Sequence, residues 1–335
     1  MKIGIRIAVV VLLSASPMSL RCQQIVFDGS DETSGRPGFQ VEWDSESQRM
    51  IAYRDASDSS WAAVRVFSTS GRLALYPLKD FPGANYVDIW AVAGSGNSDI
   101  VLSVVLGYGP RNSRPIPVKT LVLTYDAGGT LRKAWDVDPY LVHHLASDSM
   151  GNVFALAEKG LAAEDYPLLI KYSTTGEVLR EGLSTSLFPG KALVVGSGSP
   201  TGEAQLFIKN EHLFVWIATT QELFDFTLDG IFLSKISLSS AIQSMIDQSA
   251  SSRVRVLNFR VDSSHGIVCQ VQLWPKDTKL RAQVALAHIS PTGSFENWIE
   301  PPSRDDVHRF LGLSGNDKNL FLEKVNQNTV KIVLN

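Results

Sequence analysis

Short stretches of alternating apolar and polar residues, separated by polar turns, fill most of the chain. Alternation with a period of two is typical of β-strands that bury one face. One pattern recurs five times: an apolar strand, an aromatic residue or isoleucine, three turn residues, a glycine, any residue and an apolar residue. Its copies are VRVFSTSGRL, LVLTYDAGGTL, LLIKYSTTGEV, LFDFTLDGIF and ALAHISPTGSF, with glycines at Gly71, Gly129, Gly176, Gly230 and Gly293. Each copy predicts a β-hairpin whose turn needs a residue that tolerates a positive φ.

A second unit lies between these hairpins: a short strand, a polar turn and another apolar strand. Its copies are FQVEWDSESQRMIAYR, DIWAVAGSGNSDIVLSVV, VHHLASDSMGNVFALAE, ALVVGSGSPTGEAQLFI, RVLNFRVDSSHGIVCQVQL and RFLGLSGNDKNLFLEKV. In the third copy, the side chain of Asp148 is expected to cap the turn that Gly151 completes. One copy of each unit makes a four-stranded sheet.

The two ends of the chain explain why six such units accompany only five hairpins. NTVKIVLN, near the C-terminal end, is a strand without a partner, and QQIVFDG, beginning at Gln23, is a strand without a hairpin. If they pair, the chain is an all-β, six-bladed β-propeller of four-stranded antiparallel blades, closed between its N- and C-terminal strands. SSAIQSMIDQS (Ser239–Ser249) is the only helix expected, and it lies between blades.

The blade pattern, above all LASDSMGNVFALAE followed by LLIKYSTTGEVL, resembles the six-bladed β-propellers of the NHL-repeat kind and their bacterial exported relatives. The resemblance covers residues 23–335, but only the third blade matches closely. Blades one, four and six lack the Asp-x-x-Gly turn, and the usual proline and terminal aspartate of NHL repeats are missing. The resemblance implies that the first strand of each blade borders a central channel. It implies no single activity, because propellers include enzymes, ligand binders and docking scaffolds.

The residues that this alignment brings to the channel are the candidates for ligand binding, since propeller funnels are concave. They are Gln40, Trp90, His143, His144, Asn258, His308 and Arg309. Adjacent strand residues point to opposite faces, so only one of His143 and His144 is expected to face the channel. Metal ligation together with His308, or a general acid or base role, are the alternatives to a lining histidine. Trp90 is expected at the channel mouth, stacking on a sugar or peptide.

No catalytic residue, confident metal site or cofactor is predicted. Bacterial lactonases with six-bladed propellers hold a divalent metal through Glu, Asn and Asp, and Glu42, Asp88 and Asn258 are weak candidates for such a set. No motif matches theirs residue by residue. The chain also has no Gly-x-Ser-x-Gly elbow, His-Glu-x-x-His, phosphate loop or dinucleotide fingerprint.

These observations favour a non-catalytic module that binds a protein, peptide or glycan partner on one propeller face. The alternative is a metal-assisted, lactonase-like hydrolase or lyase at the mouth of the channel. A purely structural envelope protein is a third possibility, and it predicts no organised pocket.

The first 22 residues are predicted to be a secretory signal peptide, which leaves residues 23–335 as one propeller domain. Lys2 and Arg6 form a positive region, and the apolar run Ile7–Leu13 is too short to span a bilayer. Cleavage near residues 21–24 is expected, with lipidation of Cys22 as the alternative. We therefore expect an exported protein, periplasmic or extracellular, monomeric and without a transmembrane helix.

Charge and cysteine content narrow the possible partners. The chain has 31 Lys and Arg against 34 Asp and Glu, a formal charge of −3, and removing residues 1–22 takes away three cations and no acid. A mildly acidic chain without a basic run is a poor candidate for binding nucleic acid or anionic membranes. Its two cysteines cannot build a disulfide framework, and Cys269 is expected to be a small buried hydrophobe.

Overall fold

The structure is a computed structural model that describes most of the predicted propeller domain. It describes residues 23–26, 39–44, 47–54, 63–68, 73–77, 81, 83–95, 99–108, 118–159, 165–188, 204–303, 308–326 and 329–334. The predicted signal peptide, Cys22 and the hairpin glycine Gly71 lie outside the described residues.

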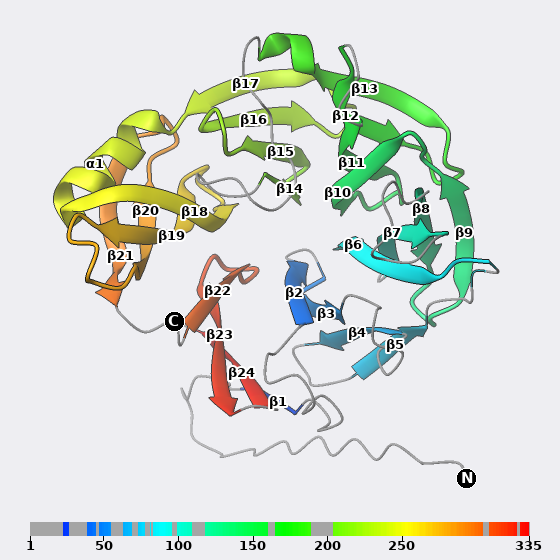
Figure 1. Ribbon diagram of the computed structural model, residues 1–335, viewed down its shortest axis with the longest axis horizontal. Helices are drawn as coiled ribbons and strands as arrows, with labels where there is room; N and C mark the ends of the chain where they lie inside the picture. Colours follow the sequence, from blue (N-terminus) through cyan, green and yellow to red (C-terminus); the bar gives the residue numbers. More distant parts are fainter. Residues whose placement is uncertain are drawn as a thin grey trace.

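Six four-stranded antiparallel sheets make up the described part of the chain, and five of them consist of consecutive strands (Figure 1). The first contains β2 (Phe39–Asp44), β3 (Arg49–Arg54), β4 (Ala63–Ser68) and β5 (Leu73–Pro77), and the second β6 (Tyr86–Gly94), β7 (Ile100–Gly107), β8 (Val118–Tyr125) and β9 (Leu131–Asp136). The third contains β10 (Tyr140–Ser147), β11 (Val153–Lys159), β12 (Pro167–Tyr172) and β13 (Val178–Ser184), followed by the short 3-10 helix η3 (Thr185–Leu187). The fourth contains β14 (Gln205–Lys209), β15 (His212–Ile217), β16 (Glu222–Thr227) and β17 (Phe232–Ser237). The fifth contains β18 (Ser251–Val261), β19 (Ile267–Pro275), β20 (Gln283–Ile289) and β21 (Phe295–Ser303).

The remaining sheet joins the two ends of the described chain. Its strands are β22 (His308–Leu313), β23 (Asn319–Asn326), β24 (Thr329–Leu334) and β1 (Gln23–Val26). β1 pairs with β24, with Gln23 opposite Ile332 and Val26 opposite Thr329. The arrangement is a β-propeller with four-stranded antiparallel blades. Six blades and a closed ring stay a prediction.

The turn chemistry predicted for the hairpins is confirmed in the described copies. Gly129, Gly176, Gly230 and Gly293 have φ of 83°, 87°, 74° and 86°. The predicted cap is also confirmed, because Oδ1 of Asp148 accepts the backbone N–H groups of residues 150 and 152 at 3.0 and 2.8 Å. A carboxylate that accepts these bonds holds the turn closed without help from neighbouring blades.

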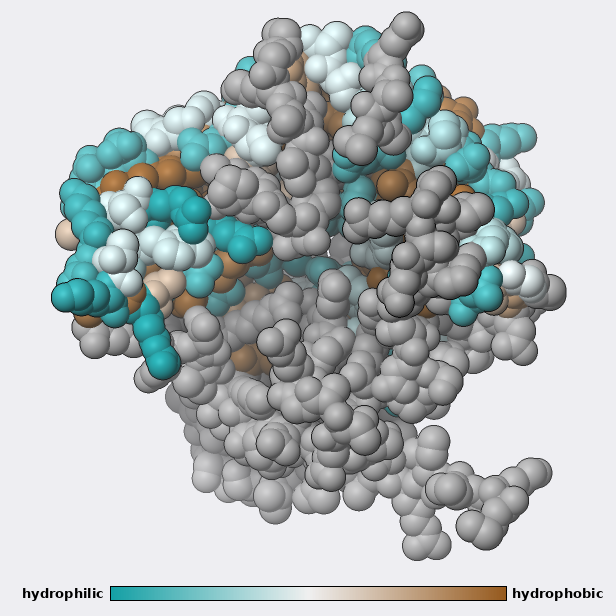
Figure 2. Space-filling model, viewed as in Figure 1, coloured by the Kyte–Doolittle hydropathy of each residue, from teal (hydrophilic) through white to brown (hydrophobic). Residues whose placement is uncertain are grey.

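The apolar core lies between blades. Five apolar clusters of the described residues each combine side chains from two neighbouring sheets. Because a blade has neighbours on both faces, strand β7 is buried at all of its positions. On the coloured part of the rim in Figure 2, hydrophilic residues predominate, with small hydrophobic areas between them.

The predicted helix is confirmed as α1 (Ser239–Ser249), between the fourth and fifth blades. It buries Ala241, Ile242 and Met245 against the cluster shared by those blades. Among the described residues, no helix is long and apolar enough to cross a membrane.

The strand assignment predicted for the fourth blade is wrong. The unit ALVVGSGSPTGEAQLFI makes QLFIK the second strand, whereas the structure makes it the innermost strand β14, paired with β15. The connecting turn is Asn210–Glu211, with φ of 51° and 63°. Two consecutive positive φ values are typical of a two-residue hairpin turn that usually carries Asn-Gly, and glutamate in the second position hides this signature.

Candidate functional site

The innermost strands β2, β6, β10, β14, β18 and β22 surround the centre of the propeller (Figure 1). Between them lies a cavity of about 70 Å³, lined by residues such as Glu42, Ala146 and Arg260. Ligand pockets begin at roughly 300 Å³, so this part of the channel has room for a few waters and not for a substrate. Most of its lining comes from the half of each strand that precedes the first turn of its blade.

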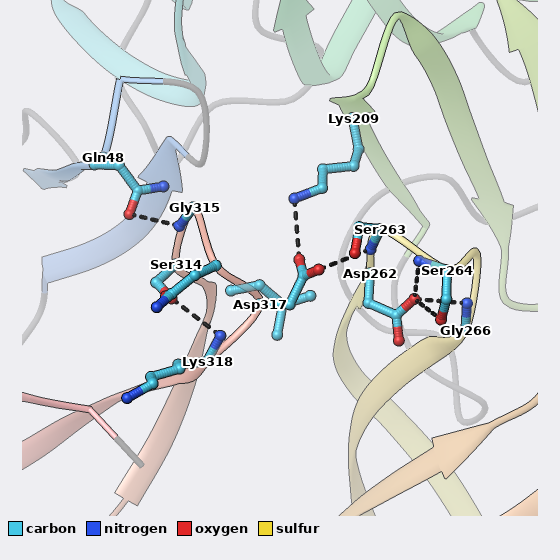
Figure 3. A network of polar contacts seen from close by, with 12 residues as sticks. Gln48, Lys209, Asp262, Ser263, Ser264, Gly266, Ser314, Gly315, Asp317 and Lys318 are labelled. Carbon is cyan, nitrogen blue, oxygen red and sulfur yellow. Dashed lines mark hydrogen bonds and ion pairs between the residues drawn. The ribbon is translucent and has the colours of Figure 1, made fainter.

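That turn end of the channel is closed by polar contacts between blades (Figure 3). Asp317, in the turn between β22 and β23, accepts a bond from Nζ of Lys209 at 3.2 Å and one from the backbone N–H of Ser263 at 3.0 Å. Gln48 of the first blade accepts the backbone N–H of Gly315 at 3.1 Å. Burial acts to raise the pKa of Asp317, but the bonds from Ser263 and Lys209 outweigh it and hold this pKa below its usual value. The inner turns of four sheets are therefore fastened to one another.

β-Bulges interrupt four of the innermost strands at equivalent positions. The added residue is Trp90 in β6, His143 in β10, Leu257 in β18 and Leu311 in β22. A bulge re-aims side chains and breaks the alternation of strand faces. Alternation therefore does not decide which way His143 and His144 point, because His143 is itself the bulged residue. Since four strands share the bulge, it is a feature of the fold, and the residue types placed on it distinguish the blades.

Two of the bulged residues meet across the boundary between the second and third blades. The ring centroids of Trp90 and His143 lie 4.9 Å apart, with 30° between the ring planes. Nε2 of His143 lies 3.5 Å from Oε2 of Glu158, and it has no hydrogen-bond partner among the described residues. We call Trp90, His143 and Glu158 the channel-mouth site, since they lie farther from the closed turn end than the residues that line the cavity.

Burial sets the ionisation of the channel-mouth site. The side chain of His143 is 17% exposed, and burial lowers its pKa to about 4. Burial also raises the pKa of Glu158. His143 is therefore neutral near pH 7, with an imidazole nitrogen not used by the fold. Such perturbed groups gather at functional sites more often than elsewhere.

Asn258 has a structural task between blades. Its Nδ2 donates to the carbonyl oxygen of Phe310 at 3.0 Å, and its Oδ1 accepts a bond from Nη1 of Arg260 at 2.7 Å. The bond to Phe310 fastens β18 to β22 and the bond from Arg260 lies within β18, so the side-chain amide is already used at both ends.

The other predicted site residues are spread over the inner strands. His144, in β10, lies opposite Leu156 of β11, and Asp88, in β6, lies opposite Val105 of β7. Both His144 and Asp88 are partly buried. Glu42 lines the small cavity. The three remaining candidates are Gln40 in β2 and His308 and Arg309 in β22, whose side chains lie outside the described residues.

Sequence reasoning missed Glu158. An acid in the apolar strand segment FALAEK is the signal that points to it, because a carboxylate there must face either a polar partner or an opening. No group of three or more His, Cys, Asp or Glu among the described residues is placed to hold a metal ion. Cys269 is buried, as predicted, and burial raises its pKa to about 12.

Comparison with known proteins defines the class of protein through the fold alone. No protein-family model matches the chain, and no curated protein matches its sequence. A candidate exported protein from Bacteroides fragilis is 10% identical with a TM-score of 0.54, over 94% of this chain and 95% of that chain. A member of the DUF4221 family from Bacteroides vulgatus is 9% identical with a TM-score of 0.51, over 95% and 96%. The chain is thus a β-propeller similar to exported bacterial proteins.

A gluconolactonase from Xanthomonas campestris is 11% identical with a TM-score of 0.44, over 94% of this chain and 90% of that chain. A similarity at this level carries no argument about activity.

Proposed function

We propose that this chain is an exported, monomeric, non-catalytic β-propeller that binds a protein, peptide or glycan partner at the mouth of its channel. The observation that carries the proposal is the ring pair of Trp90 and His143 on neighbouring bulges. Leu257, on the equivalent bulge of β18, is 38% exposed. An aromatic face beside a polar ring edge and an aliphatic side chain suits a sugar ring or a peptide side chain. Because polar contacts between the inner turns close the opposite end of the channel, the partner is expected to bind at the mouth.

A closed six-bladed ring of the NHL-repeat kind belongs to the same proposal. It is supported by the six four-stranded sheets and by the pairing of β1 with β24. It is also supported by Nε1 of Trp43, which donates to the carbonyl oxygen of Leu313 at 3.1 Å and joins the first blade to the last sheet. A ring without open sheet edges resists aggregation.

The proposal is tested by screening the purified protein against glycan and peptide arrays, followed by calorimetry on the best ligand. Trp90→Ala is expected to weaken binding at least tenfold, because truncating an aromatic anchor costs about 2 kcal/mol or more. Trp274→Ala is the matched control, since the ring of Trp274 packs 4.1 Å from the guanidinium of Arg253 and belongs to neither ring of the Trp90–His143 pair. Equal losses in the two variants would contradict a channel-mouth site.

The neutral His143 beside Glu158 favours one second candidate function. A buried imidazole with a free nitrogen can take a proton from a bound water or hydroxyl group, so the same mouth suits a hydrolase or lyase. In its lactonase-like form this enzyme would use a divalent metal. Elemental analysis after dialysis without chelator, and assays on lactones and esters, test it. Stoichiometric metal and hydrolysis that are both lost in His143→Ala would replace the binding proposal.

A further inference from the structure

A second concave site lies on the rim, away from the channel. A groove of about 840 Å³ is formed by β13, η3, β16 and β17, at the boundary between the third and fourth blades. Its volume falls within the range of roughly 300–1,000 Å³ in which small-molecule sites are found. Its apolar walls are Leu183, Leu187, Phe188, Phe224, Phe226 and Phe232.

Aromatic rings that pack against one another line the groove. The ring of Phe224 meets that of Phe188 edge to face at 5.8 Å, and Phe226 meets Phe232 in the same way at 5.8 Å. Phe232 is 54% exposed and Leu187 is 62% exposed. Large rings that pack on one another while remaining open to solvent on one side are typical of binding surfaces.

Exposed apolar residues are frequent on the elements that form the groove, and two of them, Leu187 and Phe232, line it. Six of the eleven exposed large hydrophobic residues lie on β13, on η3 or at the start of β17, namely Val178, Leu179, Leu187, Ile231, Phe232 and Leu233. The outer strand β9 of the second blade instead exposes Arg132 and Lys133. Charged outer strands prevent edge-to-edge association, so an apolar outer strand indicates a surface that is used.

Of the two cationic side chains that line the groove, Lys235 is paired with an acid and Arg180 is available to a ligand. Nζ of Lys235 is paired with Oε1 of Glu222 at 2.8 Å and lies 5.9 Å above the ring of Phe224. Arg180 forms no ion pair within the described part of the chain, and its Nη1 reaches only the carbonyl oxygen of Asp229, at 3.4 Å. Glu181 also borders the groove, and its charge contributes, after burial, to the raised pKa of Tyr140, which packs in the cluster on the other face of the blade.

We infer that this groove binds a small amphipathic carboxylate, with its apolar body against Phe224, Phe226 and Phe232 and its carboxylate on Arg180. A guanidinium presents two parallel N–H donors that match the two oxygens of a carboxylate. The groove supplies one unpaired cation beside a large apolar surface, which is the complement of a fatty or aryl acid. The site does not depend on the channel mouth.

The test is calorimetric titration of the full chain with octanoate, 1-octanol and acetate. Octanoate is expected to bind at least tenfold more tightly than 1-octanol, and acetate is expected not to bind. Arg180→Met is expected to abolish the preference for octanoate over octanol, and Phe232→Ser to weaken both ligands. Arg132→Met, on the equivalent outer strand β9, and Trp90→Ala, in the channel-mouth site, are expected to leave octanoate binding unchanged.

Any one of four results would overturn the inference. Equal affinity for octanoate and octanol, or no effect of Arg180→Met, would show unspecific apolar adsorption. Octanoate binding only after residues 190–202 are replaced by a short linker would show that the chain itself competes for the groove. A dimer in light scattering that Phe232→Ser dissociates would show that the groove is an interface between two copies.

Discussion

Gly176 meets two separate requirements of the outer hairpin turn in the third blade. Its φ of 87° lies in the region that favours glycine, and a Cβ at this position would lie 2.6 Å from Cγ of Trp135 in the preceding blade. Gly83 has a similar φ of 82°, but a Cβ there would meet nothing within 4 Å. Substitution of Gly83 therefore tests the free-energy cost of the backbone conformation alone, whereas substitution of Gly176 adds the cost of close packing.

Replacing each glycine by alanine is expected to show this difference in the free energy of unfolding. Gly83→Ala should cost about 1 kcal/mol, because an L-residue at positive φ is strained. Gly176→Ala should cost about 2–4 kcal/mol, because overpacking against Trp135 adds to that strain. Urea denaturation measures both, and Gly315→Ala, with open space and no positive φ, is the neutral reference. Equal losses at residues 83 and 176 would show that Trp135 moves aside freely.

The lowered pKa of His143 makes stability depend on pH. The unfolded chain binds a proton at this residue below pH 6.5, whereas the folded chain binds it only near pH 4. Stability is therefore expected to fall as the pH drops from 6.5 to 4, by a total on the order of 3 kcal/mol.

His143→Phe keeps a ring against Trp90 and removes the titration. Chemical denaturation of both proteins at pH 7.5, 6, 5 and 4.5 is expected to show a smaller acid-induced loss in the variant. Glu158, whose pKa burial raises, acts in the opposite direction in both proteins, so the difference between the profiles reports His143. Parallel profiles would show that His143 takes up its proton at the same pH in the folded and the unfolded protein.

Turns of the same type make the same kind of contact with a neighbouring blade. In the outer turn of the second blade, the carbonyl oxygen of Ala127 accepts a hydrogen bond of 3.4 Å from the hydroxyl of Tyr76. In the outer turn of the fourth blade, the carbonyl oxygen of Leu228 accepts one of 2.7 Å from Nζ of Lys171. In the fifth blade, Gly293 accepts the hydroxyl of Ser240 at 3.4 Å. These three hairpins thus close their own strands and also bond to the element before them, and Asp317 makes similar contacts between inner turns (Figure 3).

The pair of Lys209 and Asp317 is expected to couple the fourth blade to the last sheet. A double-mutant cycle with Lys209→Met and Asp317→Asn should give a coupling of about 1 kcal/mol near pH 7, since both groups are largely buried. The pair of Lys235 and Glu222, in which the Lys235 side chain is 47% exposed, should couple by less than about 0.5 kcal/mol.

The coupling of Lys209 and Asp317 should also depend on pH. The pKa of Asp317 is lowered, so its stabilising effect is present above pH 3.8 and is lost as the pH falls through the folded value. A coupling that persists when the carboxyl is protonated would argue for packing instead of charge.

At the scale of the whole molecule, the last sheet takes strands from both ends of the chain. β1 contributes only four residues, but it covers the edge of β24 along Thr329 to Ile332. An uncovered strand edge is a template for pairing with another molecule. The sheet is also bonded to both neighbours, through Leu313 and Trp43 on one side and Phe310 and Asn258 on the other.

A chain that begins at residue 29, and so lacks β1, is therefore expected to unfold several degrees lower than a chain that begins at Gln23, and to associate at high concentration. Differential scanning calorimetry and light scattering measure the two effects. The reason is the loss of the bonds to β24 together with exposure of its edge. Identical melting temperatures would show that the N-terminal strand adds nothing to the stability of the last sheet.

The sequence by itself determined the strands outside the fourth blade's inner pair, the described outer hairpin turns and α1, because each depends on a pattern of a few adjacent residues. Alternation marks a strand, glycine marks a positive φ and Asp148 caps its own turn, whatever lies beside them. The inner turn of the fourth blade was not predicted, because Asn210 and Glu211 adopt positive φ values without a glycine.

Only the tertiary structure decided which residues meet. Trp90 and His143 are 53 positions apart in the chain, and they touch because the bulges of two blades turn them toward each other. The groove on the rim likewise joins side chains of two blades. Such contacts depend on the spacing and twist of neighbouring sheets, which no local pattern records.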